Sequence, residues 1–586
     1  MKIDDSLHAF YAAAGPIVEE SLVNAVKLAL PYYSVPTSWH FVEAIPLTPN
    51  GKVDRVTLRT IASERGRRAD SVMVMASTVT SVAHMHRTES NPLPEHILSQ
   101  EKEPEVTQSE ISTPSSDSAK SIIDSEKGTV IVENQADTLD VPEILPPKHG
   151  FHGQRWVRHR AFILYRRFFS IVVLANLAIA VFILYRKIGQ GKSVLGDLAT
   201  AAAANLCVAV LMRSEPVVNL LFTVFCSVPT SFPLAIRRHC ARIFHIGGIH
   251  SGCAIAATAF FSIFTITATV EVAAAAPFQP VSTAVLVLSF LIVALLVAIA
   301  SMSHPTIRMK YHNTWEMSHR FGGWTALILL WAQTVLVTKD LNPSIAPSAA
   351  YLKSAPLWLL SIATAAIIFP WLHLRKVPVR SEVLSNHAVR LWFNYTTPVV
   401  GTAVRLAERP LVDWHGFATI TNPKTAQNPD ATGFSLIVSR AGDFTGRTIE
   451  RAPTHIWVRG IPTCGVLRIA TLFKSVVLVA TGSGIGPCLA VILAKKVPAR
   501  ILWTAPNPEQ TFGKDIVNSV LDTDPHAVIH NTRTMGKPNM SLMAYQLWKE
   551  SGAEAVCIIS NKKFTTKVVY DLEARGIPAY GAIFDS

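Results

Sequence analysis

"SVVLVATGSGIGPCLAVILAKK", residues 475–496, is the stretch that decides the fold of the last part of this chain. An apolar run with the length of a buried strand is followed by a glycine-rich turn and then by an apolar segment typical of a helix. Glycines let a backbone approach a pyrophosphate closely, and a helix N-terminus adds N–H donors and a positive dipole end. The stretch therefore predicts a nucleotide site made by Thr481, Gly482, Gly484, Gly486 and Pro487. A strand–turn–helix unit that binds nothing is the alternative.

The composition indicates a membrane protein with soluble parts. Of the 586 residues 49% are hydrophobic and only 16% are charged, which is too apolar for an ordinary soluble protein. The net charge is +13, but many basic residues lie at the ends of apolar runs, as in "RRHCAR" (237–242) and "RMKYH" (308–312). Nucleic-acid binding needs basic residues clustered on one soluble domain. We therefore expect the lipid bilayer, and no nucleic acid, as a partner.

The chain divides into successive zones. Residues 1–61 have the patterns of a folded segment, whereas 62–148 are rich in Ser, Glu, Thr and Pro and are predicted to be a disordered linker. Zone 149–376 holds six apolar runs, each close to the ~20 residues that cross a bilayer. This predicts a six-helix transmembrane bundle with helices near 168–185, 194–212, 243–270, 281–302, 317–337 and 357–374. Residues 377–586 are soluble, with β-like alternation that turns into an α/β pattern near 475.

The loop charges predict an orientation for these helices. Basic residues precede the first run and flank several others, whereas the loops at 271–280 and 339–353 are poor in positive charge. This alternation places both soluble ends in the cytosol, with the basic loop 186–192 as an exception. The seven cysteines form no CxxC pair, which agrees with a reducing compartment and predicts no zinc site. The apolar stretch 217–236 is expected to be broken or interfacial, because it contains Pro229 and Pro233. The membrane itself is not predicted.

Three further segments precede the glycine-rich turn in a fixed order: "VDWHGFATI" (412–420), "SRAGDFTGRTI" (439–449) and "VRGIPTCGV" (458–466). Together they resemble the ferredoxin reductase-like module of ferric reductases and NADPH oxidases. The resemblance implies an FAD-binding β-barrel over 377–470 and an NAD(P)-binding α/β domain over 471–586. It assigns flavin contacts to His415, Gly416, Phe417, Ala418, Gly460 and Gly465.

The sequence departs from that family in places. Ala418 stands where the family has a hydroxyl, and Thr419 should point to the opposite face of the strand. The late CGP motif of the family is absent, with Cys557 near its expected place. No arginine that would select the 2′-phosphate of NADPH is found near residues 502–510, so NADPH and NADH both remain open.

The same family holds two haems between paired histidines of its third and fifth helices, 13 or 14 residues apart. Here the corresponding runs contain His245 and His250, and His319, without partners at that spacing. We expect at most one inner haem b, held by His245 and His319, with His250 as the alternate ligand. The equal alternative is that these histidines lie at the membrane interface and bind no metal.

"PLTPNGKVDR" (46–55) resembles the last segment of the adenylation domains of nonribosomal peptide synthetases and acyl-CoA synthetases. The resemblance assigns to Lys52 the stabilisation of negative charge during adenylate formation. The phosphate-binding loop and acyl pocket of such domains are not recognisable in this sequence. We therefore expect no adenylation activity, and regard the segment as an inactive remnant, as the product of a truncated gene model, or as a helper of another polypeptide.

The combination of these parts resembles the fungal TmpL-type membrane flavoproteins, which share their membrane and reductase portion with TmpA-type proteins. The expected fold is multi-domain: an α+β adenylation fragment, a disordered linker, a six-helix transmembrane bundle and a ferredoxin reductase-like barrel with an α/β domain. The expected function is a membrane-bound flavin oxidoreductase in redox homeostasis or signalling. Electrons would pass from cytosolic NAD(P)H through FAD to an unknown acceptor. The alternative is a non-catalytic membrane redox sensor or scaffold, which the departure at Ala418 and the isolated adenylation segment favour.

Overall fold

The computed structural model describes residues 144–582, apart from 192, 276–278 and 424–429, and short stretches within the first 61 residues. Those stretches are 2–3, 6–12, 36, 38–42, 44–46, 54, 57–58 and 60–61. The chain forms two compact units, Met1–Gln135 and Ala136–Ser586, and each is described by itself. Lys52 and the predicted linker up to residue 143 lie outside the described residues.

The first unit contains a small sheet in which β2 (Ser6–Tyr11) is central. It pairs antiparallel with β1 (Lys2–Ile3) and parallel with β3 (Ser38–Phe41). The backbone N–H of Asp54 donates to the carbonyl of Pro46 at 2.8 Å, and the Asp54 carboxylate accepts from the N–H of Thr57 at 3.2 Å. The backbone is thus held together on either side of the segment that contains Lys52.

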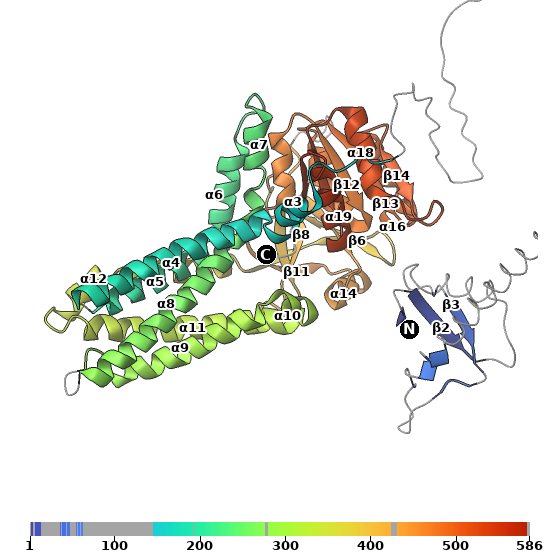
Figure 1. Cartoon of the computed structure of the whole chain (residues 1–586). Helices are drawn as coiled ribbons and strands as arrows, with labels where there is room; N and C mark the ends of the chain where they lie inside the picture. Colours follow the sequence, from blue (N-terminus) through green and yellow to red (C-terminus); the bar gives the residue numbers. More distant parts are fainter. Residues whose placement is uncertain are drawn as a thin grey trace, which may run out of the picture. The chain divides into compact units, whose positions relative to one another are not determined.

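The second unit begins with helices, which run side by side over much of their length (Figure 1). Five of the described helices are long and apolar enough to cross a membrane: α4 (Leu164–Gln190), α8 (Gly247–Ala274), α9 (Thr283–Met302), α11 (His312–Asp340) and α13 (Ala355–Leu372). Shorter segments connect or precede them: α3 (His152–Trp156), a π-helical turn η2 (Val157–Ala161), η3 (Ile243–His245), α10 (Pro305–Lys310) and α12 (Pro347–Lys353).

The second predicted span is different from the other five. It corresponds to α5 (Leu195–Leu211), which meets α6 (Glu215–Cys226) at an angle of 71°, and the pair counts as a sixth candidate span only if it is taken as one. The break follows from its sequence, because Arg213 and Ser214 are polar and Pro216 lies in the first turn of α6. The run predicted at 194–212 is thus α5, and the chain turns by 71° directly after it into α6. The break expected at Pro229 and Pro233 is confirmed, since α7 (Leu234–Cys240) begins directly after it.

A β-barrel of two four-stranded antiparallel sheets follows. One sheet has the order β5-β6-β10-β9 and the other β4-β11-β7-β8, and both enclose a core that includes the stacked rings of Phe393 and Phe434. The strands are β4 (Arg375–Pro378), β5 (Arg380–Val383), β6 (Ala388–Phe393), β7 (Thr402–Ala407), β8 (His415–Ala418), β9 (Ile420–Thr421), β10 (Phe434–Ser439) and β11 (His455–Cys464). Helix α14 (Asp443–Arg451) packs on β10 and β6, and η4 (Val466–Leu472) leads out of the barrel.

The last part is a five-stranded parallel sheet in the order β14-β13-β12-β15-β16. Its strands are β12 (Val476–Thr481), β13 (Ala499–Ala505), β14 (Val528–Asn531), β15 (Ala555–Ile559) and β16 (Ala579–Gly581). The helical segments between them are η5 (Gly482–Gly484), α15 (Ile485–Ala494), α16 (Pro508–Phe512), α17 (Lys514–Leu521), α18 (Met540–Ser551) and α19 (Lys562–Glu573). The strand, turn and helix predicted over 475–496 are confirmed. Strand β13, which follows β12 in the chain, lies on one side of β12, and β15 lies on the other side. The strand order thus reverses between β12 and β15, and in such sheets a crevice is expected at the carboxyl ends of those two strands.

Two buried charges join the helices to the C-terminal domains. Glu215 of α6 is 1% exposed, forms an ion pair with Arg405 of β7 at 2.7 Å, and accepts the N–H of Ile461 at 2.8 Å. Arg237 of α7 is 3% exposed and donates to both carboxylate oxygens of Glu554, at 2.5 and 2.9 Å. Because unpaired buried charges are costly, these contacts fix α6 on the barrel and α7 on the parallel sheet.

Candidate functional site

The glycine-rich turn lies at the carboxyl end of β12, as the sequence predicted. Gly482 has a φ of +51° and open space around it, and its carbonyl accepts the indole N–H of Trp503 at 3.0 Å. A Cβ on Gly484 would lie 2.2 Å from the carbonyl oxygen of Ile559, so the turn can pack against β15 only if this residue is glycine. Gly486 and Pro487 lie in the first turn of α15, where free backbone N–H groups favour an anion.

The neighbouring strand β15 contributes hydroxyl and amide groups to the same edge. The hydroxyls of Thr481 and Ser560 are hydrogen-bonded at 2.6 Å, and the Asn561 side chain caps α19 by accepting the N–H of Phe564 at 3.0 Å. Cys557 cannot take part, because it is fully buried within β15 and burial raises the pKa of its thiol to about 12. The polar edge between β12 and β15 therefore fits the pyrophosphate of a dinucleotide.

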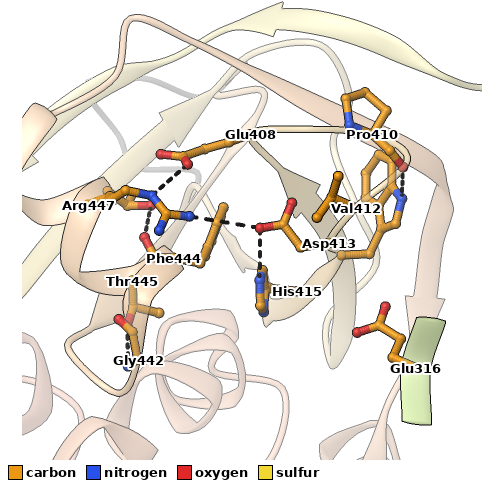
Figure 2. Close-up of polar contacts among 12 residues, drawn as sticks. Glu316, Glu408, Pro410, Val412, Asp413, His415, Gly442, Phe444, Thr445 and Arg447 are labelled. Carbon is orange, nitrogen blue, oxygen red and sulfur yellow. Dashed lines mark hydrogen bonds and ion pairs between the residues drawn. The ribbon is translucent and has the colours of Figure 1, made fainter. Parts of the chain in front are cut away.

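Figure 2 shows the second group of polar residues, at the edge of the barrel. Arg447 of α14 donates to Glu408 at 2.8 Å and lies 4.0 Å from Asp413, whose carboxylate is 3.7 Å from Nε2 of His415. The His415 ring stacks on Phe444 with centroids 4.2 Å apart. Oδ1 of Asp413 and Nε2 of His415 are buried without a hydrogen-bond partner. Buried polar atoms of this kind are uncommon, and they mark the pair as a candidate site for a bound molecule or a proton transfer.

The remaining barrel residues predicted from the sequence lie around this pair without forming one pocket with it. Gly416 is exposed with open space above it, and Phe417 packs toward the barrel core near Phe444. Ala418 is partly buried. Thr419, between β8 and β9, is fully buried, and its hydroxyl is hydrogen-bonded to that of Thr402 at 2.8 Å. Strand β8, which carries 415–418, contacts α15 and so lies beside the glycine-rich turn.

Gly460 and Gly465 have partners within the protein. A Cβ on Gly460 would lie 2.1 Å from the carboxylate of Glu215, so that carboxylate occupies the space that the resemblance assigned to a flavin. The N–H of Gly465 donates to the carbonyl of Gly401 at 2.8 Å. The stacking of Phe444 on His415 covers a ring face that the same resemblance placed against the isoalloxazine.

The histidines of the helical part pair differently from the prediction. His245 lies in η3, before α8 begins, and its ring packs on Phe244. His250 of α8 faces His319 of α11 instead, with ring centroids 6.5 Å apart, and its Nδ1 is 2.7 Å from the carbonyl of Ala209. The described residues contain no group of three or more His, Cys, Asp or Glu side chains placed to hold a metal ion.

Sequence reasoning missed Glu408, Asp413 and Arg447 as parts of the barrel-edge group. Asp413 was interpreted as a solvated strand residue, and 39 residues separate Glu408 from Arg447. The signal that could have found them is the density of charged residues around "AERPLVDWHG" (407–416), next to an otherwise apolar strand.

The family model and the two relatives that match the whole chain carry the same description. Residues 466–586 match the family model described as "Adenylate-forming reductase 03009, C-terminal domain". The whole chain is 41% identical to adenylate-forming reductase 06235 and 40% identical to adenylate-forming reductase 03009, both of Coprinopsis cinerea. It spans 56% of the length of each of these relatives. Among solved structures, the ferredoxin reductase of carbazole 1,9a-dioxygenase overlaps with 36% of this chain and 70% of its own, at 13% identity and a TM-score of 0.28, a likeness too low to assign a fold.

These relatives correct the predicted family, fold class and function. The relatives that match the whole chain are named adenylate-forming reductases, not TmpL-type or ferric reductase-like flavoproteins. The architecture to which this chain is similar is therefore an adenylation part joined to a reductase part, and the description as a six-helix bundle with ferredoxin-reductase domains was wrong. Neither the flavin electron-transfer function nor the non-catalytic redox sensor agrees with relatives of that name.

The same relatives also correct the predictions about the cofactors and about the adenylation segment. FAD and haem b were expected from local motifs alone, and the relatives are named for adenylation and reduction instead. The space around Gly460 and the stack on His415 agree with this correction. The expectation that this chain has no adenylation activity is contradicted by the same relatives, which are named adenylate-forming reductases. A nicotinamide nucleotide is a partner that suits a reductase.

Proposed function

We propose that this chain acts in an adenylate-forming reductase, which activates a carboxylic acid as its adenylate and then reduces the activated acyl group with a nicotinamide nucleotide. The observation that supports this most directly is the 41% and 40% identity, over the whole of this chain, to two proteins of that name. The match of residues 466–586 to the C-terminal domain model supports a reductase role for the part that contains the parallel sheet.

The nucleotide is proposed to bind at the carboxyl edge of β12 and β15. The requirement for glycine at 484, the open space at Gly482 and the N-terminus of α15 support a pyrophosphate there. When bound, the reduced nucleotide supplies a hydride. Thr481, Gly482, Gly484, Gly486 and Pro487 are the residues proposed to hold it, and NADPH and NADH are to be compared by experiment.

His415 is the proposed proton source for the reduction. When a hydride adds to the carbonyl carbon of an acyl thioester, the oxygen gains negative charge and takes up a proton to give a hemithioacetal. As the carbon–sulfur bond then breaks, the sulfur leaves with the electron pair, the hydroxyl gives up its proton and the thiolate takes up a proton, so the products are an aldehyde and a thiol. A histidine beside a carboxylate is suited to deliver that proton. Asp413 at 3.7 Å and the position of β8 against α15 support His415 in this role.

Lys52 is proposed to stabilise the charge of the adenylate during activation, as the resemblance of residues 46–55 implies. The assay is ATP–pyrophosphate exchange, with the N-terminal half of a Coprinopsis relative supplied as a separate polypeptide. In this assay Lys52→Ala should lower the exchange rate by at least about 100-fold, because electrostatic contacts of this kind contribute factors of that order. An exchange rate equal to that of the unchanged chain would remove Lys52 from the mechanism.

We also propose that the second unit is anchored in a membrane, with both soluble ends in the cytosol. The five long apolar helices and the bent pair support this by their length and composition. The basic residues at 237–242 and 308–312 support the orientation.

The test is to measure nucleotide binding and acyl reduction with the full chain in lipid nanodiscs. NADPH and NADH are titrated by the fluorescence of the reduced nicotinamide, and oxidation is followed at one turnover with an N-acetylcysteamine thioester while the aldehyde is trapped and identified. We expect saturable binding of at least one nucleotide and aldehyde in amounts equal to the nucleotide oxidised. His415→Gln should slow oxidation about 100-fold with unchanged nucleotide affinity. The absence of nucleotide binding, or oxidation without aldehyde, would contradict the proposal.

A further inference from the structure

A large cavity lies where the helices meet the parallel sheet. Its volume is about 2060 Å³, and it is lined by residues of α4, α8, α11 and α13 on one side and of α19 and β16 on the other. The glycine-rich turn and the barrel-edge group do not line it. The proposed nucleotide site therefore does not account for this space.

The charges that line the cavity are almost all of one sign. Eight arginines and three lysines face it, against a single acidic residue, Glu573. Glu573 is already paired with Arg242 at 3.2 Å and with His159 at 3.3 Å. Among the described residues Arg213 forms no ion pair, although it lies near both His250 and His319. This excess of positive charge favours a ligand with an anionic group.

Helix α19 presents a regular polar stripe to the cavity. Lys563, Thr566, Lys567 and Tyr570 all line it, and their spacing of three and four residues places them on one face of the helix. Helix α19 begins three residues after β15 ends, and β15 is hydrogen-bonded to β12, which carries the glycine-rich turn. The start of α19, with Lys563, therefore lies close to the edge of the sheet at which the proposed nucleotide site lies.

The walls formed by α8 and α11 are long and largely apolar, apart from His250, His319 and Arg320. Along α8 the lining extends from His250 to Thr258, and along α11 from Trp315 to Leu330. The latter distance corresponds to about 22 Å at a rise of 1.5 Å per residue. One leaflet of a bilayer holds acyl chains of about 15 Å, so these walls can cover a chain of that kind.

From this charge and shape we infer that the cavity binds a long-chain acyl group whose carrier bears phosphate. The phosphate lies against Lys563, Lys567 and Arg213, and the chain extends between α8 and α11. This inference rests on the proposed function, because a reductase that acts on activated acyl groups must bring such a carrier to the edge of the nucleotide sheet. It makes the acyl substrate of the reductase a membrane-embedded, long-chain one.

The experiment is a calorimetric titration of the full chain in nanodiscs with hexadecyl phosphate as the probe. Hexadecanol tests the chain without phosphate, and inorganic phosphate tests the anion without the chain. We expect saturable binding of hexadecyl phosphate that is at least tenfold tighter than that of either fragment. Equal affinity for hexadecyl phosphate and hexadecanol would overturn the inference.

Substitutions locate the binding. Lys563→Gln with Lys567→Gln should weaken hexadecyl phosphate at least tenfold, whereas Lys496→Gln with Lys537→Gln, which removes two exposed lysines outside the cavity, should not change it. Arg213→Gln tests the third proposed contact with the phosphate. If that variant does not fold, the double variant at Lys563 and Lys567 still tests the assignment. No difference between the two double variants would contradict the assignment.

A last experiment distinguishes an acyl carrier from an ordinary phospholipid as the ligand of the cavity. Nanodiscs containing phosphatidic acid should leave hexadecyl phosphate binding unchanged, and competition by this two-chain lipid would show a phospholipid site instead. A parallel NADPH titration distinguishes the two proposals. Nucleotide binding without hexadecyl phosphate binding would reject only the cavity ligand, whereas the reverse result would reject the proposed function.

Discussion

Gly484 is the residue on which the shape of the nucleotide turn depends most directly. In Gly484→Ala the new Cβ would meet the carbonyl oxygen of Ile559 at 2.2 Å, so the turn or β15 must move. We expect NADPH affinity to fall at least tenfold, measured by nicotinamide fluorescence. Gly416→Ala is the matched control, because a Cβ there meets nothing within 4 Å. Unchanged affinity in Gly484→Ala would show that the nucleotide does not bind at this turn.

Glu215 is the residue that joins α6 to the barrel. Glu215→Gln removes the charge opposite Arg405 and weakens the hydrogen bond to the N–H of Ile461. Hydrogen bonds to charged groups contribute about 2 kcal/mol when they are buried, and Arg405 is partly exposed, so we expect a loss of about 1 to 2 kcal/mol. In thermal unfolding this corresponds to a drop of roughly 2 to 8 °C in Tm. Glu450→Gln is the control, because Glu450 is 61% exposed and pairs with Arg440 at the surface of α14, and equal Tm values for the two variants would contradict the structural role of Glu215.

Two residue-level outcomes could not have been predicted from the sequence. Glu215 and Gly460 are 245 positions apart in the sequence. No local sequence pattern predicts that the carboxylate of Glu215 occupies the space beside Gly460. His245 and His250 were both candidates to face His319, and the choice depended on where α8 begins. Because α8 starts at Gly247, His245 precedes it and only His250 takes a helical position.

At the scale of elements, α7 is attached to the parallel sheet through one ion pair. The hydrogen bond from Arg237 lowers the pKa of Glu554 below its usual value, against the opposing effect of partial burial. A carboxylate with a lowered folded-state pKa stabilises the fold fully above its unfolded pKa of about 4.3, and this contribution is lost as the pH falls through the lower folded-state value. The attachment should therefore be constant from pH 7 to 5 and weaken below about pH 4.

Thermal unfolding of the wild type and of Glu554→Gln across this pH range checks that expectation. The difference in Tm between them should be constant down to about pH 5 and should shrink below about pH 4. Glu550→Gln is the control, since Glu550 is 44% exposed and pairs with Arg500 at 3.3 Å. A difference that grows as the pH falls would show that the ion pair does not act as described.

The elements themselves were largely predictable, whereas their chemical use was not. Apolar runs of about 20 residues form α4, α8, α9, α11 and α13, which have the length and composition needed to cross a membrane. The glycine-rich turn between an apolar strand and an apolar helix also formed as expected. The bend of 71° between α5 and α6 was missed, since it arises from only a few polar residues. The motifs around β8 and β11 resemble flavin-binding segments in order and length, but such short segments do not determine which molecule is bound.

At the scale of the whole second unit, the chain path constrains how the helices can cross a membrane. Helix α13 ends at Leu372 and β4 begins at Arg375, so an α13 that crosses the membrane as proposed would place the barrel on the side where that helix ends. The segment 341–354, between α11 and α13, then lies on the opposite side. Basic residues gather at the start of α11 rather than in this segment, which agrees with a cytosolic barrel.

Labelling of single introduced cysteines tests this arrangement directly. Ser344→Cys should react with a membrane-impermeant maleimide added to sealed cells, because Ser344 is exposed in the segment between α11 and α13. Lys496→Cys, exposed on the parallel-sheet domain, should react only after the cells are permeabilised. The seven natural cysteines are buried or partly buried, so the wild type gives the background. Because α13 joins the two regions without a further crossing, reaction at both positions in sealed cells would mean that α13 does not span the membrane. The reverse pattern would mean that the barrel and the parallel sheet face away from the cytosol.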